Sequence, residues 1–161
     1  MEIMNEVKVT INVNGQQVTA TVAPEESLLD FLRNRAGATE VKCGCNKGDC
    51  GTCTVVLDGQ TVKSCLVLAA QADNKQVLTV KGLEKEQLMQ DLQVSFANHG
   101  AVQCGFCTPG MLVTAKTFLE KNPQPSRQEI REALSGNLCR CTGYQKIVDA
   151  VAAVAAGKND K

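Results

Sequence analysis

Residues 41–55 read VKCGCNKGDCGTCTV and carry four of the nine cysteines of this 161-residue chain. The last three continue to a further cysteine with the spacing Cys45-x4-Cys50-x2-Cys53-x11-Cys65. A second quartet follows with the spacing Cys104-x2-Cys107-x31-Cys139-x1-Cys141. Each quartet holds enough thiolates for a four-cysteine metal site. The sequence therefore predicts two metal centres.

The spacing of the first quartet indicates which metal it binds. C-x4-C-x2-C followed by a distant cysteine is the pattern by which plant-type ferredoxins hold a 2Fe-2S cluster. A zinc ribbon could instead pair Cys50-x2-Cys53 with Cys104-x2-Cys107. Those pairs are 50 residues apart, however, whereas about 15–20 residues is usual for such sites. The leading hypothesis is a two-cluster electron carrier, with a zinc module as the weaker alternative.

Composition and charge exclude several other classes. The chain has 17 basic and 17 acidic residues and no formal net charge, and no basic run is interleaved with aromatic residues, so we expect no nucleic-acid partner. No apolar stretch approaches the roughly 20 residues of a membrane span, so we expect no membrane partner. Residues 1–15, MEIMNEVKVTINVNG, lack a basic and apolar export signal, and we expect a cytoplasmic protein. Nine cysteines in a reducing compartment favour metal binding over disulfides.

The first half of the sequence predicts two β-hairpins separated by a helix. Apolar and polar residues alternate on both sides of Asn14-Gly15, a dipeptide typical of a type I′ turn. Residues 27–35 place four apolar side chains on one helical face, and Gly37 can end that helix. A second hairpin turns at Asp58-Gly59 and returns Cys65 toward the other cysteines of its quartet.

The second half predicts four helices. Apolar residues recur at helical spacing around 88–96 and 111–119, and residues 126–129 form a capping-box pattern that opens a third helix ending at Gly136-Asn137. A fourth begins near Tyr144. Cys104-Gly-Phe-Cys107 and Cys139-Arg-Cys141 are each followed by threonine, a good N-cap, and Pro109 suits a first helical position. Both pairs should therefore lie at helix N-termini, whose positive dipole ends stabilise the negative charge of a cluster.

Three segments, VKCGCNKGDCGTCTV, QCGFCTPGM and GNLCRCTGYQKIV, resemble the iron-sulfur subunit of the xanthine dehydrogenase family of molybdenum hydroxylases. The resemblance covers residues 7–156, nearly the whole chain. It implies an α+β protein, with a plant-ferredoxin-like β-grasp domain over 1–82 and an all-α four-helix bundle with its own 2Fe-2S cluster over 83–161. The division that the residues themselves indicate matches both.

The resemblance also assigns roles to individual residues. It implies that one 2Fe-2S cluster is held by Cys45, Cys50, Cys53 and Cys65. It implies that the other is held by Cys104, Cys107, Cys139 and Cys141. Gln103 resembles the glutamine that hydrogen-bonds the pterin of the molybdenum cofactor in the large subunit, a role that the sequence alone does not indicate.

Two further residues depart from this pattern. Cys43 stands where the family usually has another residue, and using it in place of Cys45 would give a gap to Cys50 unlike the ferredoxin spacing. We interpret Cys43 as a spare thiol. His99 is the only histidine, whereas a Rieske-type cluster needs two, so that class is excluded. We expect His99 at a helix end before Gly100.

The resemblance implies an electron-transfer subunit of a molybdenum-dependent oxidoreductase, without catalysis on its own. The chain has no G-x-G-x-x-G motif and no room for a flavin or pterin domain beside two clusters. We expect a molybdopterin-binding large subunit and a FAD-binding medium subunit as partners. Electrons would then pass from molybdopterin through the helical and the ferredoxin-like cluster to FAD. A free-standing ferredoxin-like carrier is the alternative, although the chain lacks the acidic excess that steers such carriers.

Overall fold

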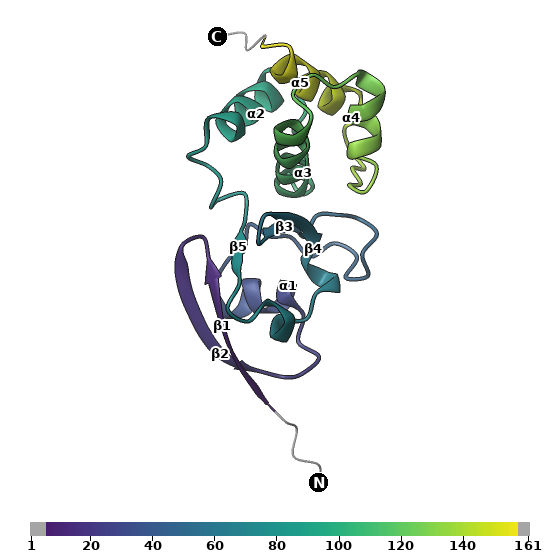
Figure 1. Cartoon of the computed structure of the whole chain (residues 1–161). Coiled ribbons are helices and arrows are strands. Elements are labelled where there is room, and N and C mark those ends of the chain that lie inside the picture. Colours follow the sequence, from purple (N-terminus) through teal and green to yellow (C-terminus); the bar gives the residue numbers. More distant parts are fainter. Residues whose placement is uncertain (1–5, 158–161) are drawn as a thin grey trace.

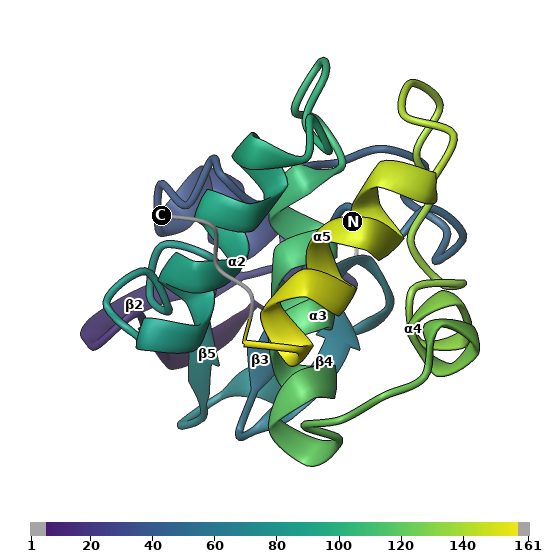
Figure 2. The same cartoon turned by 90° about the horizontal axis from the view of Figure 1, so that it is seen from above.

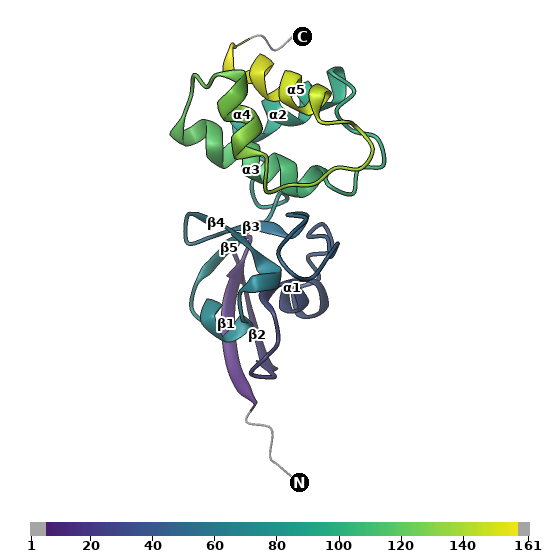
Figure 3. The same cartoon turned by 90° about the vertical axis from the view of Figure 1, so that its right-hand side faces the viewer.

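The computed structural model describes residues 6–157 and has an α+β fold. The strands lie in one part of the molecule and four helices lie in the other, stacked above the sheet in Figure 1. The chain crosses once from the sheet to the helices, after strand β5 (Figures 1 and 3). The two parts therefore follow each other in the sequence.

Both predicted hairpins are confirmed. Strands β1 (Val7–Val13) and β2 (Gln16–Val22) pair antiparallel through a turn at Asn14 and Gly15, where φ is 53° and 88°. Positive φ at both positions is the type I′ geometry that an Asn-Gly turn favours. Strands β3 (Thr54–Leu57) and β4 (Gln60–Lys63) pair in the same way around Asp58-Gly59.

A fifth strand, β5 (Gln76–Leu78), joins the hairpins into one sheet with the order β2-β1-β5-β3-β4. It runs parallel to β1 and antiparallel to β3. This strand was not predicted from the sequence. The sheet is therefore mixed, and β5 leads directly into the helical part.

The helix predicted over 27–35 forms as two short pieces, α1 (Leu28–Asp30) and the π-helical turn η1 (Phe31–Arg35). Ser27 begins it, because its hydroxyl accepts a hydrogen bond from the Asp30 amide at 3.0 Å. The apolar side chains of both pieces are buried with the inward residues of β1 in the core of the sheet part. Two 3-10 turns, η2 (Ser64–Leu66) and η3 (Ala69–Ala72), lie in the segment that connects β4 to β5.

Four helices form the second part, as predicted. They are α2 (Gln87–Asn98), α3 (Thr108–Lys121), α4 (Arg127–Ala133) and α5 (Gln145–Ala155). The capping box at the start of α4 is confirmed, with Ser126 and Glu129 bonded reciprocally. The helices bury a second core, and α3 packs against β3 and β4. Among the described residues, no helix is both long enough and apolar enough to cross a membrane.

The starts of two helices differ from the prediction. Cys107 is the N-cap of α3, which places Thr108 first and Pro109 second. Helix α5 begins only at Gln145, after Gly143 and Tyr144, where φ is 66° and 68°. These two left-handed residues turn the chain before the helix can start. Thr142 is therefore not an N-cap, and the second cysteine pair precedes its helix by a short loop.

Candidate iron-sulfur sites

The loop 41–53, between η1 and β3, carries three cysteines of the first quartet. The Cys45 sulfur accepts backbone N–H bonds from Lys47 at 3.4 Å, Asp49 at 3.3 Å and Cys50 at 3.4 Å. The Lys47 amide and then the Cys50 amide lower the pKa of Cys45 to about 6. The loop thereby favours the thiolate form, which is the form that binds iron.

The second hairpin brings Cys65 to this loop, as the sequence predicted. The Cys65 thiol is a neighbour of the Cys53 thiol, and the Cys45 thiol is a neighbour of the Cys50 thiol. Burial, followed by the contact with Cys53, raises the pKa of Cys65 to about 11. The first quartet therefore forms two pairs. Cys45 and Cys50 lie on the loop whose backbone N–H groups point at sulfur, and Cys53 and Cys65 lie next to the sheet.

The second quartet is gathered from two loops that precede α3 and α5 and project from the same edge of the helical part (Figure 2). The Cys141 and Cys104 sulfurs are 3.6 Å apart, and the Cys107 thiol contacts that of Cys139. All four line one cavity of about 220 Å³, which also reaches Cys50 of the first quartet. Burial and then the neighbouring Cys139 thiol raise the pKa of Cys107 to about 12.

Thr142 and Tyr144 hold the Cys139 loop, a role that the sequence analysis did not predict. The Cys139 sulfur accepts from the Thr142 hydroxyl at 3.1 Å and the Thr142 amide at 3.4 Å. Burial opposes the charged form of Cys139, but these bonds outweigh it and lower its pKa. The Tyr144 hydroxyl accepts from the Cys139 amide at 2.9 Å. The positive φ of Tyr144 was the local feature that no sequence pattern revealed.

The pairwise arrangement fits a two-iron core. Each iron of a four-cysteine 2Fe-2S cluster takes two thiolates, so two pairs of thiols are what one cluster requires. Both quartets provide this donor set, and the second surrounds a cavity. Over residues 6–157, no three His, Cys, Asp or Glu side chains are clustered around a single-ion position. All nine cysteines are free thiols.

The remaining residues singled out by the sequence lie on the surface or at a helix end. Gln103 is exposed and directly precedes Cys104 in the loop before α3. Cys43 is exposed, two residues before Cys45. His99 is the C-cap of α2, as expected, and its Nδ1 lies 2.9 Å from the Ser95 carbonyl oxygen.

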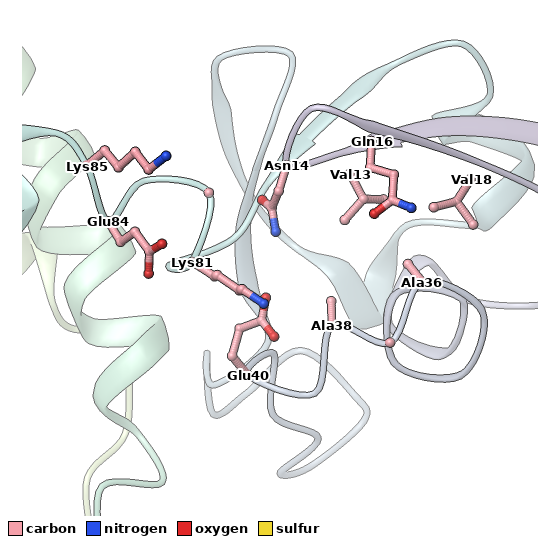
Figure 4. Close-up of a pocket in the computed structure, with 12 residues that line it drawn as sticks. Val13, Asn14, Gln16, Val18, Ala36, Ala38, Glu40, Lys81, Glu84 and Lys85 are labelled. Atoms are coloured by element: carbon pink, nitrogen blue, oxygen red, sulfur yellow. The ribbon is translucent and has the colours of Figure 1, made fainter.

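Another cavity lies apart from the cysteines. It measures about 400 Å³ and opens between the β1–β2 turn, the segment after η1 and the linker to α2 (Figure 4). Its charged side chains are Glu40, Lys81, Glu84 and Lys85, and Glu40 accepts a hydrogen bond from the Thr79 hydroxyl at 2.6 Å. None of its lining residues is a cysteine.

Comparison with known proteins agrees with this geometry. Residues 11–81 match the model of the "2Fe-2S iron-sulfur cluster binding domain", and residues 79–152 match that of the "[2Fe-2S] binding domain". The nicotinate dehydrogenase small FeS subunit of Eubacterium barkeri is 49% identical, over 92% of this chain and 94% of that protein. The xanthine dehydrogenase iron-sulfur-binding subunit of Escherichia coli O157:H7 is 42% identical, over 90% and 92%.

A solved structure extends the likeness to three dimensions. A chain of quinoline 2-oxidoreductase from Pseudomonas putida 86 superposes with a TM-score of 0.87 and 47% identity, over 95% of this chain and 96% of that one. The two relatives and this solved structure each match both parts of the molecule, over almost the full length of the chain. The chain therefore belongs to the family of 2Fe-2S iron-sulfur subunits of xanthine dehydrogenase-like molybdenum hydroxylases.

Proposed function

We propose that the two quartets each hold one 2Fe-2S cluster. The ligands of the first are Cys45, Cys50, Cys53 and Cys65. The ligands of the second are Cys104, Cys107, Cys139 and Cys141. The observation that carries the proposal is the pairing of thiols in both places, Cys141 with Cys104 at 3.6 Å among them, because a two-iron core takes two thiolates on each iron.

We propose domain limits of 1–82 and 83–161, of which residues 1–5 and 158–161 lie outside the described structure. The first domain is a plant-ferredoxin-like β-grasp, supported by a mixed five-stranded sheet with α1 and η1 packed on it. The second is a four-helix bundle, supported by the common core of α2, α3, α4 and α5. The single crossing after β5 supports the boundary between them.

The complex in which this subunit works is a heteromeric oxidoreductase. A molybdopterin-binding large subunit and a FAD-binding medium subunit are the partners, and electrons pass from the molybdopterin centre through both 2Fe-2S clusters to FAD. Each cluster supplies one-electron transfer when bound, whereas substrate and flavin exchange electrons in pairs. Support comes from relatives whose names describe them as small or iron-sulfur-binding subunits of dehydrogenases.

The order of the two clusters rests on Gln103. It is exposed beside Cys104, so its amide is available to a partner's cofactor. We therefore assign it a hydrogen bond to the pterin and place the helical cluster on the molybdenum side. The other cluster then faces FAD. We also propose a cytoplasmic location, because a chain with nine cysteines available for metal binding suits a reducing compartment.

Purification of the tagged full chain under native, oxygen-poor conditions tests this function. We expect visible absorption from iron-sulfur clusters and co-elution of two larger subunits that contain molybdenum and flavin. A coloured protein that never co-elutes with such subunits would indicate a free-standing carrier instead. A colourless protein with bound zinc would indicate a zinc-stabilised interaction module and contradict the proposal.

A further inference from the structure

The two cysteine quartets meet at a backbone contact between their loops. The Leu138 amide donates a hydrogen bond to the Cys50 carbonyl at 2.8 Å. Cys50 belongs to the first quartet, and Leu138 directly precedes Cys139 of the second. The loops that carry the two proposed clusters are thus joined by one hydrogen bond, although they come from different parts of the molecule.

Asn137 adds a side-chain connection at the same place. It is buried, with only 5% of its surface exposed. Its Nδ2 donates to the Gly51 carbonyl at 3.0 Å, and its Oδ1 accepts from the Thr114 hydroxyl at 3.0 Å. One amide group therefore connects the Cys50 loop to α3, the helix whose N-cap is Cys107. The backbone of Asn137 continues through Leu138 to Cys139.

Two glycines permit the loops to approach this closely. A Cβ at Gly51, where φ is +71°, would lie 2.3 Å from the Gly136 carbonyl oxygen. A Cβ at Gly110 in α3 would lie 2.4 Å from the Gly51 carbonyl oxygen. Both distances are far below a normal contact, and both clashes are with backbone, which has no side-chain freedom to relieve them.

We propose that Asn137 is a positioning residue that sets the separation between the two cysteine quartets and hence between the two clusters. The proposal rests on the proposed function, because it presumes a cluster in each quartet. Packing of α3 on β3 and β4 holds the two parts together. The hydrogen bonds from Asn137 to Gly51 and from Leu138 to Cys50 lie between the cysteine loops themselves. Separation matters here because electron transfer between two centres slows steeply with distance.

Asn137 also satisfies a more ordinary requirement, since a buried amide needs hydrogen-bond partners wherever it lies. If Asn137 had only a structural role, removing its side-chain hydrogen bonds would have the same effect as removing any similar buried hydrogen bond. Ser95 provides that comparison. It is 4% exposed, and its hydroxyl donates to the Ala150 carbonyl at 2.8 Å, a bond between two helices of the same part that does not reach the cysteine loops.

The experiment measures magnetic coupling between the two clusters in the reduced, cluster-loaded full chain by electron paramagnetic resonance. Asn137→Asp keeps the acceptor for Thr114 and the side-chain size but removes the donor to Gly51. Thr114→Val removes the bond on the α3 side and leaves the bond to Gly51 available. Ser95→Ala is the matched control. Dipolar coupling falls with the cube of the separation, so it reports the distance directly.

We expect Asn137→Asp to reduce the line splitting or relaxation enhancement between the clusters, Thr114→Val to do so less, and Ser95→Ala to leave both at the wild-type value. Wild-type coupling in an Asn137→Asp protein that shows both cluster signals would overturn the proposal, as would an equal change in Ser95→Ala. If Asn137→Asp does not fold, Thr114→Val decides in the same way. Absence of two cluster signals from the wild-type chain would instead overturn the proposed function.

Discussion

Cys45 and Cys107 are the same residue type in opposite surroundings. Three backbone N–H groups point at the Cys45 sulfur and lower its pKa to about 6, whereas burial raises the pKa of Cys107 to about 12. Iron binds thiolates, so cluster insertion has to release more protons from the buried thiols than from Cys45. The two sites therefore shift the pKa of their cysteine thiols in opposite directions, although both cysteines are proposed to bind iron as thiolates.

Cys43 and Cys45 provide a direct test of ligand assignment at the scale of one residue. The Cys43 side chain is exposed, whereas the Cys45 sulfur accepts three backbone N–H bonds. We expect Cys43→Ser to retain both cluster signals in electron paramagnetic resonance. Cys45→Ser should weaken or abolish only the ferredoxin-like signal. The opposite behaviour of the two variants would show that the ligand assignment is displaced by one motif position.

The grouping of eight cysteines into two quartets was predictable from their spacing, but the residues that contact them were not. Thr142 bonds the Cys139 sulfur instead of capping α5, because two left-handed residues separate it from the helix. Tyr144 and Asn137 act through contacts with Cys139 and Gly51. The Asn137–Gly51 contact joins residues 86 positions apart, and a single sequence carries no local signal for such a pair.

Among the elements, the hairpins and helices were predictable because each has a local signature. Asn14-Gly15 and Asp58-Gly59 supply the positive φ angles of their turns, and Ser126 with Glu129 forms the expected capping box. Strand β5 has only three residues, with Val77 alone fully buried. It exists because β1 and β3 both offer it hydrogen-bond partners, so tertiary context and not periodicity determines it.

Lys116 of α3 links the helical elements to the linker that follows β5. Its side chain is 6% exposed, and its Nζ lies 2.6 Å from a carboxylate oxygen of Glu86 and 2.8 Å from one of Glu120. We expect Lys116→Met to lower stability by about 1.5–3 kcal/mol, the range for hydrogen bonds to charged groups. That corresponds to about 3–12 °C in the thermal midpoint. Lys121→Met, at the exposed end of the same helix, should change stability by less than about 0.5 kcal/mol.

The pH dependence of this Lys116 contribution follows from its pKa. Burial alone would lower the pKa of Lys116, but the bonds to Glu120 and Glu86 outweigh it, and the pKa is raised above 10.5. When the pKa of a lysine is higher in the folded state than in the unfolded state, its contribution to stability is fully present below the unfolded-state pKa. That contribution is lost only as the pH rises through the folded-state pKa. The difference between wild type and Lys116→Met should therefore be equal at pH 7 and pH 9. Its disappearance by pH 9 would show that burial dominates.

At the level of the whole molecule, the electron route proposed above passes through the helical cluster first. We expect Cys139→Ser to leave reduction of molybdenum by substrate possible in an assembled complex but to block electron arrival at FAD. Turnover with a flavin-side acceptor should be lost while single-turnover molybdenum reduction remains. Rapid-mixing spectroscopy distinguishes the two steps.

Gln103→Ala is the milder companion variant, because it removes a neutral hydrogen bond of about 0.5–1.5 kcal/mol and no ligand. It should keep both clusters and slow, without abolishing, flavin reduction. Wild-type flavin reduction in an assembled Cys139→Ser complex shown to lack the helical cluster would contradict the proposed route.

The proposed function requires that this one chain hold two 2Fe-2S clusters on its eight paired cysteines. Iron and acid-labile sulfide analysis of the fully loaded chain, combined with electron paramagnetic resonance after reduction, tests this requirement. We predict about four iron and four sulfide per chain and two distinct cluster signals. Zinc in place of iron, or only two irons with a single signal in a fully loaded preparation, would contradict it.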